Sequence, residues 1–526
     1  MLITELLRQN AQQYPDEPAF VSIDTKNIVK GVDESYYNCR REISWKEFDD
    51  AANKVANFLI GLGVKKGSKV GIVMKNRLEY LALYFGIQRA GAISVQINFR
   101  FQAADLERSL KLTDIEVLAF DGSCRDVVCQ IQPSFSEMKA FIAMDDAATD
   151  FSMPWADVMK SSASDPGVVL KPSDDAVIYF SSGTTGAPKA VVHTHATVEA
   201  AVLTEHGNHH QVHEDCFVLI PPLYHMGGMF HWFGNLLCGA KCVLMLGFCP
   251  DVFLDVLNKE NVTIAFLLLP WIQDVLSRFR ELNLQNSANS TYPKWKLLHT
   301  GAQAIPPTAI HQVKKVFPNL ECQISYGLTE SGAPGCINLS GDRLDKLGSV
   351  GVPQHGWQAK VADGNGNEVA AGLNGELYLK CDHMMRCYYK DPDSTEKALS
   401  GGWLHTGDVA RMDEDGFFYI DGRIKDIVIS GGENVYPVPI ETFLRTHPAI
   451  KDAAVFGIPD ERMGEAVVAK VSLEVGMSCT EAELLAFCLQ LPKYKRPHRI
   501  FFGNVPRNAT GKIDKVSLRR QYAQEQ

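Results

Sequence analysis

A loop rich in glycine and hydroxyl groups lies between two strand-like segments in the first half of the chain. Residues 181–189 read Ser-Ser-Gly-Thr-Thr-Gly-Ala-Pro-Lys, after a β-branched and aromatic run at 175–180. Glycines let successive backbone N–H groups face one side, and the hydroxyls and lysine add donors that suit a polyphosphate. An ordinary polar turn can have the same composition. A standard P-loop is excluded, because Ala190 rather than Ser or Thr follows Lys189.

A second segment, residues 325–330, combines an aromatic ring, a hydroxyl and a carboxylate in the order Ser-Tyr-Gly-Leu-Thr-Glu. The ring of Tyr326 can stack on a purine, the hydroxyl of Thr329 can hold a phosphate, and Glu330 offers the hard oxygen that Mg²⁺ prefers. Read alone, the segment could equally be a strand and turn with an incidental acid.

The two segments and several others, in order, resemble the motifs of adenylate-forming enzymes, in the branch of the acyl-CoA synthetases. The others are Thr194-His195, 219–228, 297–303, 402–408, 421–426 and 505–513. The resemblance covers essentially the whole chain. Ala190 and Cys387 stand where the family usually has glycine, so the turn before Tyr388 is expected to differ in shape.

The resemblance implies a role for each matching residue. Lys512, Thr184 and Glu330 would be catalytic, with Glu330 as the Mg²⁺ ligand. ATP or AMP would be bound by Ser181, Ser182, Gly183, Thr185, Gly186, Lys189, Gly301, Ala302, Gln303, Tyr326, Gly327, Thr329, Asp408 and Arg423. A carboxylate can accept hydrogen bonds from two ribose hydroxyls, and an arginine can donate to ribose or phosphate.

The family's acyl pocket corresponds to the segment that starts at Pro221-Pro222. We expect the pocket to be lined by Tyr224, His225, Met226, Met229, Trp232 and Trp271. Bulky rings would make it short and wide, and methionines would let it adapt. The predicted substrate is therefore a hydrophobic carboxylic acid, cyclic (benzoate-like or alicyclic) or of medium chain length. The alternative is that these side chains belong to the core.

The elements that must position these residues alternate along the chain. Helices are predicted at 47–62, 80–89 and 103–112, and strands at 69–74, 92–96 and 115–120, which implies a parallel sheet covered on both faces. The predicted fold is α/β. A large domain of stacked mixed sheets (1–424) is followed by a small mobile α+β domain (425–526), with a hinge at Lys425 and a CoA tunnel beside Gly431 and Gly432.

Composition limits the remaining choices. The 526 residues carry a net charge of −10 and no long basic block, which argues against nucleic-acid binding. No signal peptide or membrane-spanning run is recognisable, and the 13 scattered cysteines lack metal-site spacing, so a cytoplasmic protein with reduced thiols is expected. Histidines at 206, 209, 210 and 213 would share a helix face as metal ligands would, but a solvated loop or helix end is the preferred interpretation.

The predicted function is an AMP-forming carboxylate–CoA ligase that uses ATP, Mg²⁺ and coenzyme A, as a monomer or homodimer. An adenylating enzyme that loads a carrier protein is the first alternative. An inactive nucleotide- or acyl-binding module is the second, although the joint presence of Thr184, Glu330, Asp408, Arg423 and Lys512 speaks against it.

Overall fold

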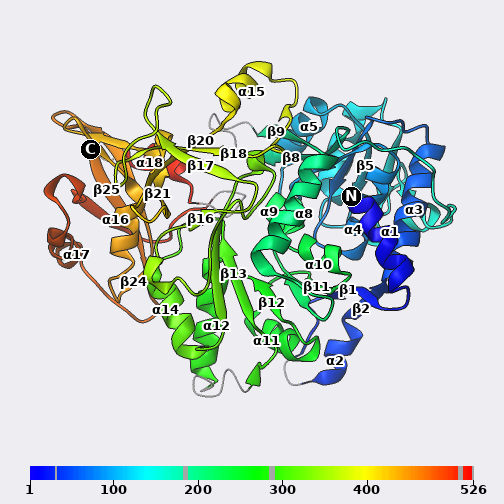
Figure 1. Ribbon diagram of the computed structural model, residues 1–526, viewed down its shortest axis with the longest axis horizontal. Helices are drawn as coiled ribbons and strands as arrows, with labels where there is room; N and C mark the ends of the chain where they lie inside the picture. Colours follow the sequence, from blue (N-terminus) through cyan, green and yellow to red (C-terminus); the bar gives the residue numbers. More distant parts are fainter. Residues whose placement is uncertain (30–31, 182–187, 283–290, 508–512, 524–526) are drawn as a thin grey trace.

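The computed structural model describes residues 1–29, 32–181, 188–282, 291–507 and 513–523 (Figure 1). The first 400 or so residues form a large body built on two mixed sheets. The C-terminal segment, orange to red in Figure 1, forms a smaller body at the opposite end from the N-terminal helix α1 (Ile3–Gln13). This mixed α/β architecture confirms the predicted fold class.

An eight-stranded sheet occupies the N-terminal end of the large body. Its order is β19-β9-β8-β4-β3-β5-β6-β7, parallel from β8 to β7 and antiparallel at β9 and β19. The bounds are β3 Lys69–Val73, β4 Ile93–Gln96, β5 Ile115–Phe120, β6 Ala140–Ala143, β7 Met153–Pro154, β8 Asp175–Ser181, β9 Lys189–Thr194 and β19 Cys387–Tyr388.

The helices predicted beside these strands are present within two residues of their expected bounds. They are α3 (Trp45–Gly61), α4 (Leu78–Arg89) and α5 (Ala103–Leu112), followed by α6 (Arg125–Ile131). Ser44 caps the start of helix α3: its hydroxyl accepts from the N–H of Glu47, and the Glu47 carboxylate accepts from the N–H of Ser44. A Cβ at Gly86 would lie 2.5 Å from the Val55 Cβ, so glycine allows α4 to approach α3 closely.

A nine-stranded sheet lies beside the first one. Its order is β16-β15-β14-β13-β12-β10-β11-β1-β2, with parallel pairing from β14 through β1. The bounds are β1 Pro18–Ile23, β2 Arg40–Ser44, β10 Cys216–Leu219, β11 Lys241–Met245, β12 Ile264–Phe266, β13 Leu297–Gly301, β14 Glu321–Tyr326, β15 Ile337–Leu339 and β16 Val352–Pro353.

Further helices complete the large body, and several of them contribute to the core between the two sheets. Their bounds are α2 Asp33–Asn38, α7 Trp155–Val158, α8 His195–His209, α9 Met226–Phe230, α10 Phe233–Cys238, α11 Pro250–Lys259, α12 Leu269–Glu281, α14 Pro307–Val316 and α15 Pro392–Ala398. The largest cluster of buried apolar side chains joins α1, α3, α4, α9 and α10 to strands of both sheets. The two sheets therefore share one core, which α8 to α10 help to fill.

A four-stranded antiparallel sheet, β17-β18-β20-β21, links the two bodies. Its strands are β17 Gln358–Ala362, β18 Gly375–Lys380, β20 Leu404–Met412 and β21 Phe418–Arg423. The smaller body has the order β23-β22-β25-β24, with β26 on β25 and helices α16 to α18 against it. Its bounds are β22 Val428–Ser430, β23 Glu433–Val435, β24 Ile450–Asp460, β25 Gly464–Leu473, β26 Arg499–Phe502, α16 Pro437–Leu444, α17 Glu481–Phe487 and α18 Lys515–Tyr522.

No helix within the described ranges is both long and apolar enough to span a membrane.

Candidate active site

Asp408 lies where the linking sheet meets the nine-stranded sheet. The antiparallel register of β20 and β21 puts Asp408 opposite Arg423, whose Nε donates to Asp408 Oδ1 at 2.6 Å. Tyr326, at the end of β14, donates its hydroxyl to Asp408 Oδ2 at 2.5 Å. Tyr326 and Arg423, from β14 and β21, thus meet at the buried carboxylate of Asp408.

The backbone around Asp408 is also fixed. Its N–H donates to the hydroxyl of Thr406, which in turn donates to the carbonyl of Leu377 on the neighbouring strand β18. The N–H of Gly407 donates to Glu376 Oε1, and Gly407 has a φ of +69°, a conformation that favours glycine. The carboxylate is therefore held by its side chain and by its main chain.

The two side chains that donate to Asp408, those of Tyr326 and Arg423, stay protonated because their pKa values are raised. Burial, followed by the negative charge of Asp408, raises the pKa of Tyr326 well above its usual range. Burial has the largest single effect on Arg423 and alone would lower its pKa, but the charges of Asp408, Tyr326, Glu330 and Asp426 together more than offset it and the pKa is raised. A carboxylate has about four lone-pair positions. Two are used here, so Asp408 can accept further hydrogen bonds from a ligand.

Glu330 and Lys189 meet at the ring of Tyr388. Glu330 lies in a short 3₁₀ helix at Thr329–Ser331, and its Oε1 accepts from the Tyr388 hydroxyl at 2.9 Å. The Lys189 Nζ lies 4.4 Å from the centroid of the same ring. The charges of Glu330 and Asp408 both raise the pKa of Arg423, so the two clusters are near neighbours. Tyr388 was not predicted as a site residue; only the departure at Cys387 drew attention to this turn.

The predicted phosphate loop begins and ends on adjacent strands. Ser181 in β8 pairs with Lys189 in β9, so the loop leaves and re-enters the sheet at one point. Ser182, Gly183, Thr184, Thr185 and Gly186 lie outside the described residues, as does Lys512.

The segment predicted to meet adenine follows β13. A Cβ at Gly301 would lie 2.5 Å from the carbonyl oxygen of Ser325, so close approach of β14 requires glycine there. The next residue, Ala302, has a φ of +65°. Gln303 Oε1 accepts from Arg507 Nη1 of the smaller body at 3.4 Å. Arg507 belongs to a motif noted in the sequence but was not predicted to reach this site.

A glycine also shapes the turn after Tyr326. A Cβ at Gly327 would lie 2.3 Å from the carbonyl oxygen of Ala333.

The predicted acyl-pocket residues divide into two groups. Met226, Met229 and Trp232 are buried in the central core, where Trp232 packs edge-on against Phe20 at 4.8 Å. Trp232 therefore belongs to the core, and we leave it out of the acyl pocket proposed below.

The second group is less enclosed. His225 is half-buried and its ring lies 4.2 Å from that of Tyr224. Half-buried Trp271 stacks on Phe248 at 5.1 Å.

Helix α9 has one tightly packed side and one open side. A Cβ at Gly228 would lie 2.1 Å from the carbonyl oxygen of Pro222, so backbone fills that side. Beyond its chain neighbours and the helix backbone, a Cβ at Gly227 would meet only the His231 ring among the described residues, with Nε2 at 3.7 Å and Cδ2 at 3.9 Å. Gly227 and His225 are the half-exposed residues of this segment and mark its open side.

The histidine-rich segment differs from its prediction. Helix α8 continues to His209, which is buried, while His210 is exposed. The preferred interpretation as a solvated helix end is therefore wrong for His209. Its Nε2 lies 2.8 Å from Nδ1 of His299, and the His299 Nε2 lies 2.6 Å from the hydroxyl of Ser325. His209 is thus linked through His299 on β13 to Ser325 on β14, a connection that spacing along the chain could not show.

The predicted hinge and tunnel residues lie near the start of the smaller body. The carbonyl of Lys425 accepts from Arg519 Nη1 at 3.2 Å. Gly431 and Gly432 are exposed in the turn between β22 and β23, with φ of +58° and +83°. A Cβ at Gly431 would lie 2.5 Å from Met463 Cε.

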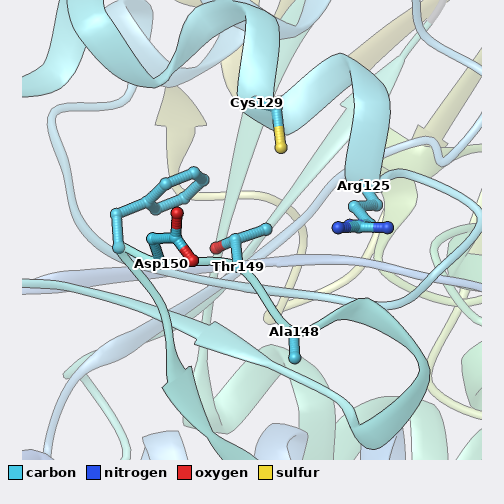
Figure 2. Close-up of a pocket in the computed structure, with 6 residues that line it drawn as sticks. Arg125, Cys129, Ala148, Thr149 and Asp150 are labelled. Carbon is cyan, nitrogen blue, oxygen red and sulfur yellow. The ribbon is translucent and has the colours of Figure 1, made fainter.

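A pocket of roughly 370 Å³ lies apart from these groups, between α6 and the loop before β7 (Figure 2). It is lined by Arg125, Cys129, Ala148, Thr149, Asp150 and Phe151. None of these residues carries a predicted role.

Two family models match the chain. One, described as AMP-binding enzyme, matches residues 7–389, and the other, AMP-binding enzyme C-terminal domain, matches 439–512. Long-chain-fatty-acid–CoA ligase FadD13 of Mycobacterium tuberculosis is 32% identical over 491 residues, which cover 91% of this chain and 93% of that protein. The 2-succinylbenzoate–CoA ligase of Bacillus cytotoxicus is 30% identical over 470 residues, with 89% and 91% covered.

Solved structures give a matching result. ATP-bound MatB from Rhodopseudomonas palustris superposes with a TM-score of 0.86, and apo MatB with 0.77. Each is 25% identical to this chain, with full coverage of both chains.

The buried histidines predict how stability depends on pH. Burial, and then the neighbouring histidines, lower the pKa of His209 to about 3. Between that value and the ordinary pKa near 6.5, the unfolded chain binds a proton that the folded chain does not. Stability must therefore fall as pH falls, by up to about 1.4 kcal/mol per unit for this residue.

Urea unfolding at several pH values from 6.5 to 5.5 measures this dependence. Buried His193, His195 and His299 have lowered pKa values too. We therefore expect His209→Gln to make the dependence shallower by the share of one proton, and exposed His210→Gln to leave it unchanged. An equally steep dependence in His209→Gln would contradict the prediction.

Proposed function

The chain belongs to the AMP-binding enzyme family as an AMP-forming carboxylate–CoA ligase, and we propose that its acid is cyclic or of medium chain length. The observation that carries the proposed site is the meeting of Tyr326, Arg423 and Asp408 beside the Glu330–Lys189 cluster. It joins groups suited to a purine, a ribose and a polyphosphate within one region.

In the first half-reaction the acid's carboxylate attacks the α-phosphorus of ATP and pyrophosphate leaves. An anion must approach a polyanion, so catalysis depends on positioning and on cations directed at the developing charge. Asp408 would accept from the ribose hydroxyls and Tyr326 would lie against adenine. Lys189 and the loop before it, which includes Thr184, would donate to the phosphates.

Glu330 fits the proposed Mg²⁺ site. Its Oε1 is oriented by the Tyr388 hydroxyl, and its Oε2 has no hydrogen-bond partner among the described residues. Mg²⁺ is commonly bound through one or two carboxylates together with substrate phosphates. The ion would neutralise phosphate charge there. The protein's part is to hold the carboxylate in place.

The second half-reaction forms the thioester. We propose that the smaller body (425–526) rotates about Lys425 and brings Gly431 and Gly432 towards the acyl-adenylate, so that the pantetheine thiol can reach the acyl carbon. A φ fixed by proline or a tight packing contact would hinder such a hinge. The side chain of Lys425 is exposed, and its carbonyl accepts from Arg519 Nη1.

The arrangement of the two bodies supports the adenylating state. Arg507 of the smaller body contacts Gln303 of the larger one, five residues before Lys512 in the sequence. The chain also superposes better on ATP-bound MatB than on apo MatB, with TM-scores of 0.86 and 0.77. Lys512 would then be near the attack site, as the adenylation step requires.

The substrate proposal rests on the open side of α9. Tyr224 and His225 form an aromatic pair there, and Trp271 on Phe248 would close the far end. The relatives include a long-chain-fatty-acid–CoA ligase and a 2-succinylbenzoate–CoA ligase, so both chain-like and ring-like acids occur among them. Flat rings pack well between aromatic side chains, which favours a cyclic acid.

All 13 cysteines are free thiols, which suits a reducing compartment, and we place the enzyme in the cytoplasm as a monomer or homodimer.

The test is AMP formation by the purified protein with MgATP, CoA and a panel of acids. We expect benzoate, cyclohexane carboxylate or hexanoate to give the highest kcat/KM. Acetate or palmitate as the best substrate would contradict the substrate proposal. If omitting CoA left AMP release unchanged, CoA would not be the acceptor of the acyl group. If none of the acids gave AMP, the assigned reaction would be contradicted.

Lys512→Ala is expected to separate the two half-reactions. Loss of a cation directed at the transition state costs about 3–4 kcal/mol, or roughly 10²–10³ in the rate of adenylation. Thioester formation from presynthesised acyl-AMP should be nearly unchanged. Exposed Arg520→Ala is the control for a lost positive charge. Equal losses in both steps would show that Lys512 has another role.

A further inference from the structure

A buried carboxylate and an imidazole form a pair behind the open side of α9. Glu205, on α8, has no exposed side-chain surface, and its Oε2 lies 3.1 Å from Nδ1 of His231, just after α9. The His231 ring stacks on Phe266 of β12 at 4.1 Å, which holds its plane. The pair connects three elements of the large body and has no part in the chemistry described above.

The neighbouring histidines cannot supply charge to Glu205. His209 Nδ1 is 3.7 Å from Glu205 Oε2, but the same nitrogen lies 3.1 Å from Nε2 of the Gln211 amide. His209 and His299 are hydrogen-bonded to each other and onward to Ser325. Burial lowers the pKa of both, so they are neutral near pH 7. His231 is the one imidazole left to balance the carboxylate in this network of described residues.

The number of protons on the Glu205–His231 pair decides whether the second ring nitrogen of His231, Nε2, is a hydrogen-bond donor or an acceptor. A lone buried negative charge is costly, and Glu205 Oε1 has no hydrogen-bond partner among the described residues, so an uncompensated carboxylate is disfavoured. The pair is then neutral. A proton on Oε1 is disfavoured, because that O–H would be a buried donor without a partner among the described residues. The pair therefore carries one shared proton between Oε2 and Nδ1, and wherever that proton lies, the second ring nitrogen, Nε2, carries a hydrogen and is a donor.

This donor faces the open side of α9. Nε2 lies 3.7 Å from the position of a Cβ at Gly227, and apart from the two chain neighbours and the helix's own backbone, the His231 ring is the only group of the described residues within 4 Å of that position. No partner for Nε2 is found among the described residues. The polar network also ends at Ser325, next to the nucleotide-site residue Tyr326. A substrate that extends from the adenylate past Ser325 and along α9 would therefore reach His231.

We propose that His231, oriented by Glu205, is a specificity-determining residue whose Nε2–H donates to an acceptor oxygen on the acyl group, remote from the carboxylate that is activated. This inference rests on the proposed function, because it assumes that the acid lies along α9. It narrows the substrate class from plain cyclic or medium-chain acids to those that carry a distal carbonyl, hydroxyl or carboxylate oxygen.

Matched acids test the proposal by kcat/KM in CoA-dependent AMP formation. The pairs are cyclohexane carboxylate with 4-oxocyclohexane carboxylate and hexanoate with 5-oxohexanoate, because a ketone only accepts hydrogen bonds. In the wild-type enzyme we expect at least one oxo acid to exceed its plain partner by about 10- to 100-fold, the range of a good buried hydrogen bond. The donor-bearing 4-aminobenzoate should gain nothing over benzoate.

Two variants locate the effect at His231. His231→Phe should bring the oxo-to-plain ratio to about 1. Gly227→Ala should lower the same ratio by placing a methyl group beside Nε2, at an ordinary contact distance that leaves the fold intact. A general loss of space for the acyl group would slow both acids of a pair, so it would cancel in the ratio. Exposed Leu203→Ala, on the same helix as Glu205, is the control and should keep the wild-type ratio. If His231→Phe fails to fold, Gly227→Ala alone decides the question.

The outcomes separate this inference from the proposed function. If none of the acids gave AMP, the proposed function itself would be contradicted. Turnover of plain acids with an oxo-to-plain ratio near 1 in the wild type, or a ratio unchanged in both variants, would overturn the role of His231. Glu205, His209 and His299 could also hold a metal ion. A stoichiometric transition metal in the purified protein, lost in His209→Gln, would likewise overturn the proposal.

Discussion

The hydrogen-bonded carboxylate of Asp408 is the interaction on which the arrangement of this enzyme depends. It ties β20 of the linking sheet to Tyr326 at the end of β14 and to Arg423, the last residue of β21. Removing either partner would leave a buried charge poorly compensated, which is costly. The same contacts that hold two sheets together thus prepare a ligand site, since the carboxylate still has lone pairs to offer.

Close backbone approach is the second constraint. Gly301 lets β13 approach β14, Gly327 lets the turn after Tyr326 fold back, and Gly228 lets α9 pack against Pro222. At each position the lack of a side chain allows two backbone segments to come close together. At Gly227, by contrast, the missing side chain leaves room. Rigid contacts on one side of α9 and open space on the other define where an acyl group can lie.

Much of this could be predicted from the sequence, for physical reasons that differ between regions. The alternation of helices and strands from residue 47 to 120 is a local signal, and the structure confirms it. The motif around Tyr326 and those containing Asp408 and Arg423 could be matched one by one. Their meeting could not be derived from spacing, because Tyr326 and Asp408 are 82 residues apart.

The acyl side was less predictable. The segment after His225 is apolar on every side, so no periodicity tells which residues face a pocket, and Trp232 packs in the core. The Glu205–His231 pair and the His209–His299 contact join residues 26 and 90 positions apart, with no motif to mark them. Histidine spacing indicated a shared helix face, and the preferred interpretation was a solvated loop or helix end. The burial of His209 could not be predicted, because burial is a property of the tertiary structure.

The claim that Asp408 binds the ribose can be measured directly by calorimetric titration of MgATP and Mg-2′,3′-dideoxyATP. The wild-type enzyme should bind the dideoxy nucleotide more weakly, by roughly 10²-fold or more, since two hydrogen bonds to a charged group are lost. In Asp408→Asn the two nucleotides should bind with nearly equal affinity. If Asp408→Asn discriminated between them as strongly as the wild type, the nucleotide site would lie elsewhere and the account would fail.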